Sequence, residues 1–415
     1  MRTLSLLGHV EEVHGLILQG GGPADLVFRD FFRARRYLGA SDRRFVAETA
    51  YALLRHRFLL DAVDARLPAQ VIALEARGKL PIGRTDLMEA AAEAMGTDPR
   101  DLDGVARRAR DAQGPPSPPA ARIAFEHSLP PWLAERLAEE YGAEDAERLA
   151  AALNEPAPIA LRANTLLNSR DDLLARLAGE GIAARPGAVA PDSLLLERRI
   201  NVFSSPSFLA GRFEVQDEGS QMVAVTLDPR PTARILDACA GTGGKTLHLA
   251  AIMRGKGEVF AYEPSARRRE ELRRRVRRSS AQNVRILDDA KGVGGSMDVV
   301  LVDAPCSGTG TLRRNPFLKS NLAPEDIARH AAEQLAILRQ WAPFVKPGGL
   351  LAFVTCSLLR EENEAVVEAF LDDGGYAPAP LVRVLLPHLH GTDGFFIARL
   401  RRLPAPGAPG VPDDG

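Results

Sequence analysis

Short apolar runs alternate with segments of helical periodicity through the second half of the chain. Each run is short and mostly apolar, and turns or helical stretches follow it; the runs are 234–237, 258–262, 284–287, 299–302 and 350–354. Runs of this length indicate buried strands, and their alternation with helices is typical of βαβ units. The pattern therefore predicts an α/β fold with a doubly wound, parallel sheet over residues 221–403. A last strand is expected at 395–400.

Helical spacing dominates the beginning of the chain. Apolar residues between positions 28 and 54 recur at helical intervals, and Ala-rich sequence follows them. The run Gly-Pro-Pro-Ser-Pro-Pro at 114–119 cannot continue a helix, so we place a boundary there and expect an all-α domain over 1–114. From 120 to 220, amphipathic helices give way to strand-like segments, which indicates a small α+β subdomain. The Pro/Gly-rich end at 404–415 is expected to be disordered.

The composition is that of a soluble globular protein, with 415 residues of which 45% are hydrophobic and 26% are charged. No apolar stretch approaches a membrane span, and no signal-type segment opens the chain. Three cysteines, an odd number, cannot form a complete disulfide framework, and no Cys/His cluster suggests a metal site. We expect a cytoplasmic protein that acts as a monomer and contacts no membrane.

Arginines gather in two segments although the net charge is only −1. The second segment runs from Arg267 to Arg278. It is either a solvated helix face or a surface for phosphate groups, for which arginine is the better bidentate partner. The charge pattern therefore permits an RNA partner and does not by itself establish one.

A glycine-rich turn joins the first strand of the predicted sheet to a helix. Its sequence is Asp237-Ala238-Cys239-Ala240-Gly241-Thr242-Gly243-Gly244-Lys245-Thr246. Such a turn lets a ligand approach the backbone and the helix N-terminus, as in sites for nucleotides, dinucleotides and S-adenosylmethionine. The spacing is not that of a P-loop. We expect Lys245 to contact cofactor or substrate rather than solvent alone, and we interpret Cys239 as structural.

Acidic residues follow the next two strands. Glu263 is placed to accept hydrogen bonds from both hydroxyls of a ribose, the alternative being a surface glutamate at a strand end. After the third strand, either Asp288 or Asp289 is placed to bind an adenine amino group. A glycine-rich turn and acids at successive strand ends together predict a nucleoside cofactor.

Two cysteines also follow apolar runs, Cys306 within Ala-Pro-Cys-Ser and Cys356 within Thr-Cys-Ser. Ligands of such sheets sit beyond the carboxyl ends of the strands, so both thiols are expected at one functional edge. A thiolate that adds to carbon 6 of a pyrimidine makes carbon 5 nucleophilic enough to take a methyl group, and Asp303 is placed to hydrogen-bond the ring. Free cysteines are often merely buried, but the turn residues beside these two favour a chemical role.

These motifs resemble those of the Sun/Fmu-type RNA cytosine-5 methyltransferases, over the whole chain and most strongly after residue 120. Besides the glycine-rich turn, the matching segments are Leu161-Arg162-Ala163-Asn164-Thr165, Val215-Gln216-Asp217, Asp303-Ala304-Pro305-Cys306-Ser307-Gly308-Thr309-Gly310, Arg313-Arg314-Asn315-Pro316, Thr355-Cys356-Ser357, Glu361-Glu362-Asn363 and Asp393-Gly394-Phe395-Phe396. The first domain is similar to the NusB-like helical RNA-binding domain that such proteins carry.

The resemblance implies a Rossmann-like, S-adenosylmethionine-dependent methyltransferase domain, an RNA-facing α+β subdomain before it, and an RNA substrate. Small-subunit (16S) ribosomal RNA is favoured, and tRNA stays open. It further implies that Cys356 is the nucleophile and that Cys306 assists release of the methylated base. The cofactor site it implies consists of Cys239, Ala240, Gly241, Thr242, Gly243, Gly244, Lys245, Glu263, Asp288 and Asp303.

The chain departs from the family pattern at two points. The family loop reads Ala-Ala-Pro-Gly-Gly-Lys, whereas residues 240–245 read Ala-Gly-Thr-Gly-Gly-Lys, and the loss of proline is expected to loosen the turn. Glu263 replaces the commoner aspartate. We expect both changes to modify cofactor affinity rather than abolish binding. Two alternatives remain: a non-catalytic RNA-binding or assembly factor with a degenerate domain, and an amino-group methyltransferase, which typically carries Pro-Pro-Tyr or Pro-Pro-Phe after the fourth strand.

Overall fold

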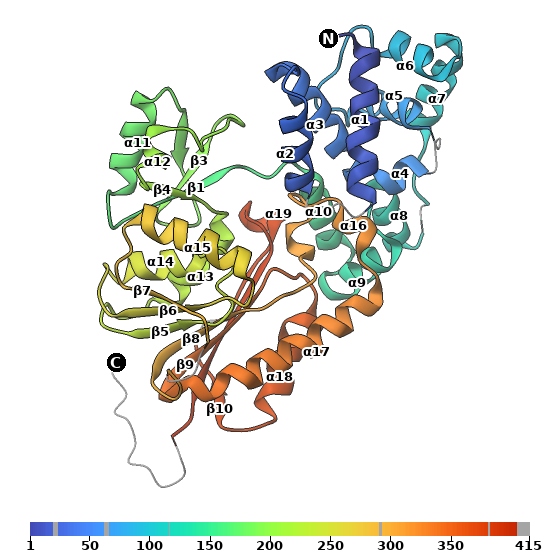
Figure 1. Ribbon diagram of the computed structural model, residues 1–415. Helices are drawn as coiled ribbons and strands as arrows, with labels where there is room; N and C mark the ends of the chain where they lie inside the picture. The colour runs from blue at the N-terminus through green and yellow to red at the C-terminus, as the bar shows by residue number, and fades with distance from the viewer. Residues whose placement is uncertain (20–23, 62–65, 116, 290–292, 381, 405–415) are drawn as a thin grey trace. The chain divides into compact units, whose positions relative to one another are not determined.

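The computed structural model describes residues 1–19, 24–61, 66–115, 117–289, 293–380 and 382–404. Contacts divide the chain into two compact units (Figure 1). The first unit comprises Met1–Glu155 together with Leu312–Pro324. The second comprises Pro156–Thr311 together with Glu325–Gly415. The predicted disordered end lies outside the described residues from position 405 onwards.

The described part of the first unit is helical, in agreement with the periodicity of its sequence. Its helices are α1 (Thr3–Leu18), α2 (Ala24–Ala34), α3 (Ala40–Arg55), α4 (Arg57–Asp61), α5 (Leu67–Ala76), α6 (Leu87–Met95), α7 (Pro99–Asp111), α8 (Pro119–Glu126), α9 (Pro131–Tyr141), α10 (Ala143–Asn154) and α16 (Leu318–Asn321). The compact unit continues past the Pro-rich run at which the sequence placed a boundary. Helix α8 packs on α4, and the Ser128 hydroxyl accepts the Phe58 N–H at 2.9 Å.

A distant segment of sequence completes this helical unit. Lys319, on α16, is buried, and its ammonium donates to the Arg55 carbonyl at 2.9 Å, the Ser128 carbonyl at 3.1 Å and Asn154 Oδ1 at 2.6 Å. Burial lowers the pKa of Lys319 well below its ordinary value. The sequence pattern does not indicate this insertion, because most of the acceptors are backbone carbonyls that any residue supplies.

The second unit opens with a small antiparallel sheet in the order β2-β3-β1-β4. Its strands are β1 (Ala160–Ala163), β2 (Ala184–Pro186), β3 (Ser193–Leu196) and β4 (Phe213–Val215), covered by α11 (Arg170–Gly179) and α12 (Pro206–Leu209). The predicted α+β character is confirmed for this part, while the helices α8–α10, which the sequence grouped with it, belong to the first unit.

The large sheet has the order β10-β12-β9-β8-β5-β6-β7, with β11 paired to β12. Its strands are β5 (Arg234–Asp237), β6 (Glu258–Tyr262), β7 (Val284–Leu287), β8 (Met297–Asp303), β9 (Val345–Thr355), β10 (Tyr376–Pro378), β11 (Arg383–Leu385) and β12 (Phe395–Arg402). Strands β5 to β9 run parallel, as predicted. Strand β12 is antiparallel to β9 and β11, and the short link from β11 to β12 permits only an antiparallel pair between those two strands.

Alternate residues of each central strand pack against helices on opposite faces of this sheet. Val299 and Leu301 of β8 join a core with α13 (Glu218–Leu227) and α14 (Gly244–Ile252). Val300 and Val302 join a core with α17 (Pro324–Trp341) and α18 (Glu364–Leu371). Burial on both faces explains why the strands are continuous apolar runs. The fold is therefore the predicted doubly wound α/β sheet preceded by helical and α+β parts (Figure 1).

None of the helices among the described residues combines the length and apolar character needed to cross a membrane.

Candidate active site

The candidate residues follow the carboxyl ends of the parallel strands. Because β5 to β9 run in one direction, their carboxyl ends share one edge of the sheet, where ligands of such folds bind. The glycine-rich turn follows β5, Glu263 follows β6, Asp288 follows β7, Asp303 ends β8, and the cysteines follow β8 and β9. Every one of these residues belongs to the second unit.

The two cysteines meet at this edge. Cys306 Sγ lies 3.3 Å from Cys356 Sγ, and the Cys356 backbone N–H donates to Cys306 Sγ at 3.3 Å. Both residues are partly buried. The hydrogen bond with Cys306, reinforced by burial, raises the pKa of the Cys356 thiol well above its ordinary value. The prediction that both thiols emerge at one edge is confirmed, and without a substrate they form a hydrogen-bonded pair.

A buried carboxylate connects the two cysteine loops. Glu362 accepts the Ser307 N–H at 2.8 Å and the Ser357 hydroxyl at 2.6 Å, and it also accepts the Ser307 hydroxyl. Gln334, from α17, donates to the same carboxylate at 3.0 Å. Ser307 directly follows Cys306 and Ser357 directly follows Cys356, so Glu362 fixes the relative position of the two thiols. Sequence reasoning assigns this glutamate no role beyond its place in a matching motif.

An ion pair lies beside the thiols. Lys245 Nζ, at the start of α14, is 2.6 Å from Asp303 Oδ2 and lies over the Phe395 ring, 5.3 Å from its centroid. Burial alone would lower the pKa of Lys245, but the Asp303 carboxylate outweighs burial and raises it. Lys245 therefore stays protonated, and its positive charge favours the thiolate form of Cys356. The expectation that Lys245 does more than face solvent agrees with this contact.

The glycine-rich turn borders a cavity of about 230 Å³. Its lining includes Cys239, Ala240, Gly241, Thr242, Gly244, Lys245, Asp237 and Asp303. Gly243 has φ +92°, and a Cβ there would come within 2.3 Å of a Leu272 methyl, so only glycine fits. Burial raises the pKa of the Cys239 thiol, and its side chain packs beside the apolar core under the sheet edge, which agrees with a structural role.

The remaining predicted acids differ in their surroundings. Glu263 is buried, and its Oε1 accepts the Ser265 N–H at 2.7 Å and lies 3.2 Å from Arg268 Nε. Asp288 is 81% exposed and faces Arg273 at 3.4 Å. The cysteines, Asp303 and Lys245 thus form one cluster, while Asp288 stands at the exposed end of β7. The choice between Asp288 and its neighbour as an adenine ligand stays a prediction.

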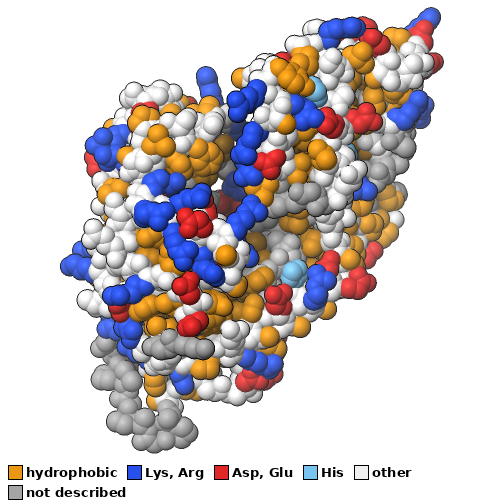
Figure 2. Space-filling model, in the orientation of Figure 1, with side chains coloured by type: hydrophobic (Ala, Val, Ile, Leu, Met, Phe, Trp, Pro, Cys, Tyr) orange, Lys and Arg blue, Asp and Glu red, His pale blue; other side chains and the backbone are white. Residues whose placement is uncertain are grey.

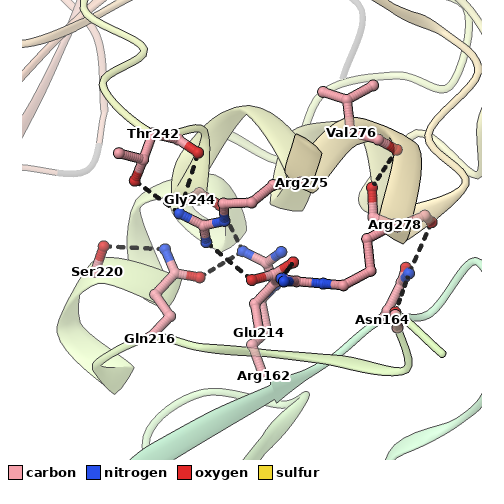
Figure 3. Close-up of polar contacts among 12 residues, drawn as sticks. Arg162, Asn164, Glu214, Gln216, Ser220, Thr242, Gly244, Arg275, Val276 and Arg278 are labelled. Carbon is pink, nitrogen blue, oxygen red and sulfur yellow. Dashed lines mark hydrogen bonds and ion pairs between the residues drawn. The ribbon is translucent and has the colours of Figure 1, made fainter. Parts of the chain in front are cut away.

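Residues from the small sheet and from α15 (Ala266–Ser279) also reach the turn, and sequence reasoning assigned none of them to the site (Figure 3). Arg162 is buried on β1, contacts Gln216, and donates to the Gly244 carbonyl at 2.6 Å. Burial lowers the pKa of Arg162 to about 10. Gln216 and Arg275 line the cavity. In the sequence, the arginine within an otherwise apolar strand was the one feature that indicated such a contact, because a buried charge needs a specific partner.

The cavity suits a nucleoside that carries an amino acid. Amide groups at the start of α14 complement a carboxylate. The carboxylates of Asp237 and Asp303 in the cavity wall, and the buried carboxylate of Glu263 after β6, complement ammonium and ribose hydroxyl groups. Gly241 and Gly243, both at positive φ, keep side chains away from the turn. No group of three or more His, Cys, Asp or Glu in the described part of the chain is arranged to hold a metal ion.

Sheet order, turn and strand-end groups together assign the second unit to the Rossmann-like S-adenosylmethionine-dependent methyltransferases. A family profile described as 16S rRNA methyltransferase RsmB/F matches residues 224–401, and a profile for its ferredoxin-like domain matches residues 129–203. The chain belongs to this RsmB/F family of methyltransferases, which confirms the resemblance found in the sequence. Its members are enzymes, so the alternative of a non-catalytic factor is set aside.

Individual relatives agree with this assignment. The chain is 36% identical over 307 residues to the probable ribosomal RNA small subunit methyltransferase B of Bacillus subtilis, covering 68% of each chain. It is 33% identical to the ribosomal RNA small subunit methyltransferase B of Xylella fastidiosa, covering 86% of this chain and 89% of the relative. A crystal structure of a methyltransferase homologue from Pyrococcus horikoshii superposes with a TM-score of 0.62 at 31% identity, covering 69% of this chain and 100% of that one.

Proposed function

We propose that this protein transfers a methyl group from S-adenosylmethionine to carbon 5 of a cytosine in small-subunit ribosomal RNA. The observation that carries the proposal is the 3.3 Å approach of Cys306 and Cys356 beside the Lys245–Asp303 ion pair. Carbon 5 of cytosine is a poor nucleophile, and thiol addition to the ring is the chemistry that activates it. The choice of RNA follows the names of the relatives from Bacillus and Xylella.

Cys356 is the attacking residue in this proposal. Its thiolate adds to carbon 6, and the electron pair of the ring double bond moves to carbon 5, which takes up the methyl group that S-adenosylmethionine supplies when bound. The Lys245 ammonium favours the thiolate that this step requires. In this proposal the Asp303 carboxyl group hydrogen-bonds the polar edge of the base while remaining paired with Lys245. The residue roles come from the family resemblance, and the geometry is consistent with them.

Cys306 completes the cycle. After methyl transfer, carbon 5 must lose its proton, so that the electron pair can return to the ring and expel the Cys356 sulfur. Cys306 Sγ is close enough to Cys356 to assist this release. An amino-group methyltransferase would need neither thiol, and the Ala-Pro-Cys sequence after the fourth strand departs from the motif of that class.

The target base must leave any stack to reach Cys356, because the thiol lies at the edge of a sheet and not on a protruding element. Single-stranded or splayed RNA is therefore the proposed substrate. We further propose that the helical unit is a NusB-like RNA-binding domain, that the small α+β sheet faces RNA, and that the protein acts as a monomer in the cytoplasm.

Methylation of purified RNA in vitro tests the proposal. The full-length protein is incubated with S-adenosylmethionine carrying a labelled methyl group and with either unmodified small-subunit ribosomal RNA or tRNA. We expect 5-methylcytosine, identified by mass spectrometry of nucleosides and located by bisulfite sequencing, in the ribosomal RNA only. Methyl groups on another atom would overturn the cytosine-5 assignment, and labelling of tRNA alone would overturn the substrate assignment.

Two cysteine variants separate the proposed roles. Cys356→Ala should give no product, because no thiolate can attack. Cys306→Ala should accumulate a protein–RNA adduct that survives denaturing electrophoresis, because attack occurs and release is impaired. Glu368→Gln, which breaks only an exposed ion pair with Arg360, is the control and should retain methylation. If Cys356→Ala methylates RNA at the rate of the unmodified protein, the assigned nucleophile is wrong.

A further inference from the structure

The turn after β5 has little intrinsic rigidity. Gly241 has φ +55° and Gly243 has φ +92°, and Thr242 lies between them. Glycine loses more conformational freedom on ordering than any other residue. A turn built this way must be held by contacts from outside if it is to keep one shape before the cofactor arrives.

Arg275, on α15, supplies such a contact (Figure 3). Its Nη1 donates to the Thr242 carbonyl at 3.1 Å and to the Thr242 hydroxyl at 2.7 Å. One nitrogen thereby fixes both the backbone and the side chain of the same residue. Thr242 and Arg275 both border the cavity beside the turn, so this contact is part of its wall.

A buried carboxylate orients the arginine. Arg275 Nη2 lies 3.0 Å from Glu214 Oε2, and Arg278, one helical turn further on, contacts the other oxygen of the same carboxylate. The Glu214 side chain is 4% exposed and that of Arg275 is 14% exposed. Because the planar guanidinium presents its donors in a fixed fork, the ion pair with Glu214 directs the other nitrogen at Thr242.

The outward side chains of the same helix behave differently. Arg274 and Arg277 are 65% and 68% exposed, and among the described residues each forms ion pairs only with carboxylates of the same helix. In Figure 2, basic side chains gather on the surface over the region that α15 occupies in Figure 1. The arginine-rich segment therefore combines an exposed basic face with two inner arginines, of which only Arg275 contacts the turn.

We propose that Arg275 is a positioning residue for the cofactor turn, which holds Thr242 in the conformation that S-adenosylmethionine requires. A turn ordered in advance costs less conformational entropy on binding, so losing this contact weakens cofactor binding. The inference rests on the proposed methyl-transfer function only in that the cavity takes S-adenosylmethionine. It does not depend on which base or which RNA is methylated.

Calorimetric titration of the full-length protein with S-adenosylmethionine, without RNA, tests the proposal. Arg275→Ala should weaken binding about tenfold, the loss that corresponds to a net hydrogen-bonding contribution of ordinary size. Thr242→Val removes only the hydroxyl contact and should give a smaller loss. The double variant should bind about as weakly as Arg275→Ala alone, because the hydroxyl has no partner once the arginine is gone.

Arg278→Ala is the matched control. It removes an arginine from the same helix and the same Glu214 carboxylate, yet within the described part of the chain Arg278 makes no hydrogen bond or ion pair with the turn. It should bind S-adenosylmethionine as the unmodified protein does. In steady-state assays, Arg275→Ala should raise KM for S-adenosylmethionine while KM for RNA stays unchanged, a split that general destabilisation would not produce.

Three outcomes overturn the proposal: unchanged cofactor binding by Arg275→Ala, an equal loss in Arg278→Ala, or equal rises in both KM values. Thermal melting establishes that each variant is folded, and Arg275→Lys, which keeps the charge but loses the fork, serves if the alanine variant is not. That lysine variant should also bind more weakly. Normal binding with no methylation of any RNA would instead contradict the proposed function and leave the role of Arg275 intact.

Discussion

The Sγ atoms of Cys306 and Cys356 lie 3.3 Å apart, although 50 positions separate the two residues in the chain. Adjacent parallel strands bring them together, because β8 and β9 end side by side at the same edge of the sheet. The hydrogen bond between the thiols and their burial keep the pKa of Cys356 well above its ordinary value. This relationship has consequences for both pH dependence and redox sensitivity.

The first prediction concerns pH. A raised pKa means that Cys356 is a thiol at neutral pH, and its proton must leave before attack. We expect kcat/KM for RNA to rise with pH, approaching about tenfold per unit on the acidic side of the thiol pKa. Assays between about pH 6 and pH 10 measure this dependence. Lys245→Met should move the rise to higher pH, because the ammonium favours the thiolate. A profile that is flat in both proteins contradicts the assignment.

The second prediction concerns oxidation. Two thiols this close can lose two hydrogen atoms to a mild oxidant such as diamide and form a disulfide. We expect loss of methyltransferase activity that dithiothreitol reverses, together with a cross-linked peptide pair two hydrogen atoms lighter than its parts. Cys239→Ala should still form the cross-link on oxidation, and Cys306→Ala should form no such link. Reversible inactivation without the cross-link would assign the effect to another thiol.

Sequence patterns predicted the parts of this architecture that depend on burial. Strands β5, β6 and β7 match their predicted ranges because both faces of a parallel sheet select apolar side chains. The direction of β12 and the insertion of residues 312–324 into the helical unit leave no such signature. Pairing direction and long-range packing depend on partners far away in the chain.

The candidate site likewise contains residues that the sequence predicts and residues that it does not. Strand-end logic placed Asp303, Cys306 and Cys356 together, and the structure does so as well. The ends of the predicted strands did not indicate a role for Glu362 or Arg275, because each of these residues contacts a loop that is far away in the chain. The missing proline at position 242 led us to expect a looser turn, whereas Thr242 is held from outside by Arg275. The absence of proline at position 242 does not by itself reveal that a contact from another helix compensates for it.

The third prediction concerns Glu362, whose carboxylate accepts hydrogen bonds from both cysteine loops. In the Glu362→Gln variant an NH₂ group replaces one of the two acceptor oxygens. This new donor then faces a hydrogen-bond donor of a neighbouring residue, and the hydrogen bond is lost. We expect a loss of about 1–3 kcal/mol in the free energy of unfolding, measured by urea denaturation. kcat should fall as well, because the two thiols lose their fixed separation. The control Glu368→Gln breaks only an exposed pair with Arg360 and should change stability by at most about 1 kcal/mol. Equal effects in the two variants would refute a specific role.

The fourth prediction concerns Asp237, whose carboxylate is buried and accepts the Thr246 hydroxyl at 2.6 Å. Burial raises the pKa of Asp237 from its ordinary value of 3.8 to about 6. The folded state therefore holds the proton more tightly than the unfolded state does. Its contribution to stability is present below about pH 4 and is lost as pH rises through about pH 6, with an amplitude of ~3 kcal/mol.

Asp237→Asn removes this titration and keeps an oxygen that can accept the Thr246 hydroxyl. The free energy of unfolding of the variant, relative to the unmodified protein, should increase between about pH 4 and pH 8. Urea denaturation at intervals across this range measures the difference. Asp298→Asn provides a control of opposite sign, because the Arg234 N–H and Lys346 outweigh burial and lower the pKa of Asp298. That variant should lose stability, relative to the unmodified protein, as pH rises through the range below about pH 4, and the difference should level off above about pH 5. A pH-independent difference for Asp237→Asn would show that this carboxyl group titrates alike in the folded and unfolded states.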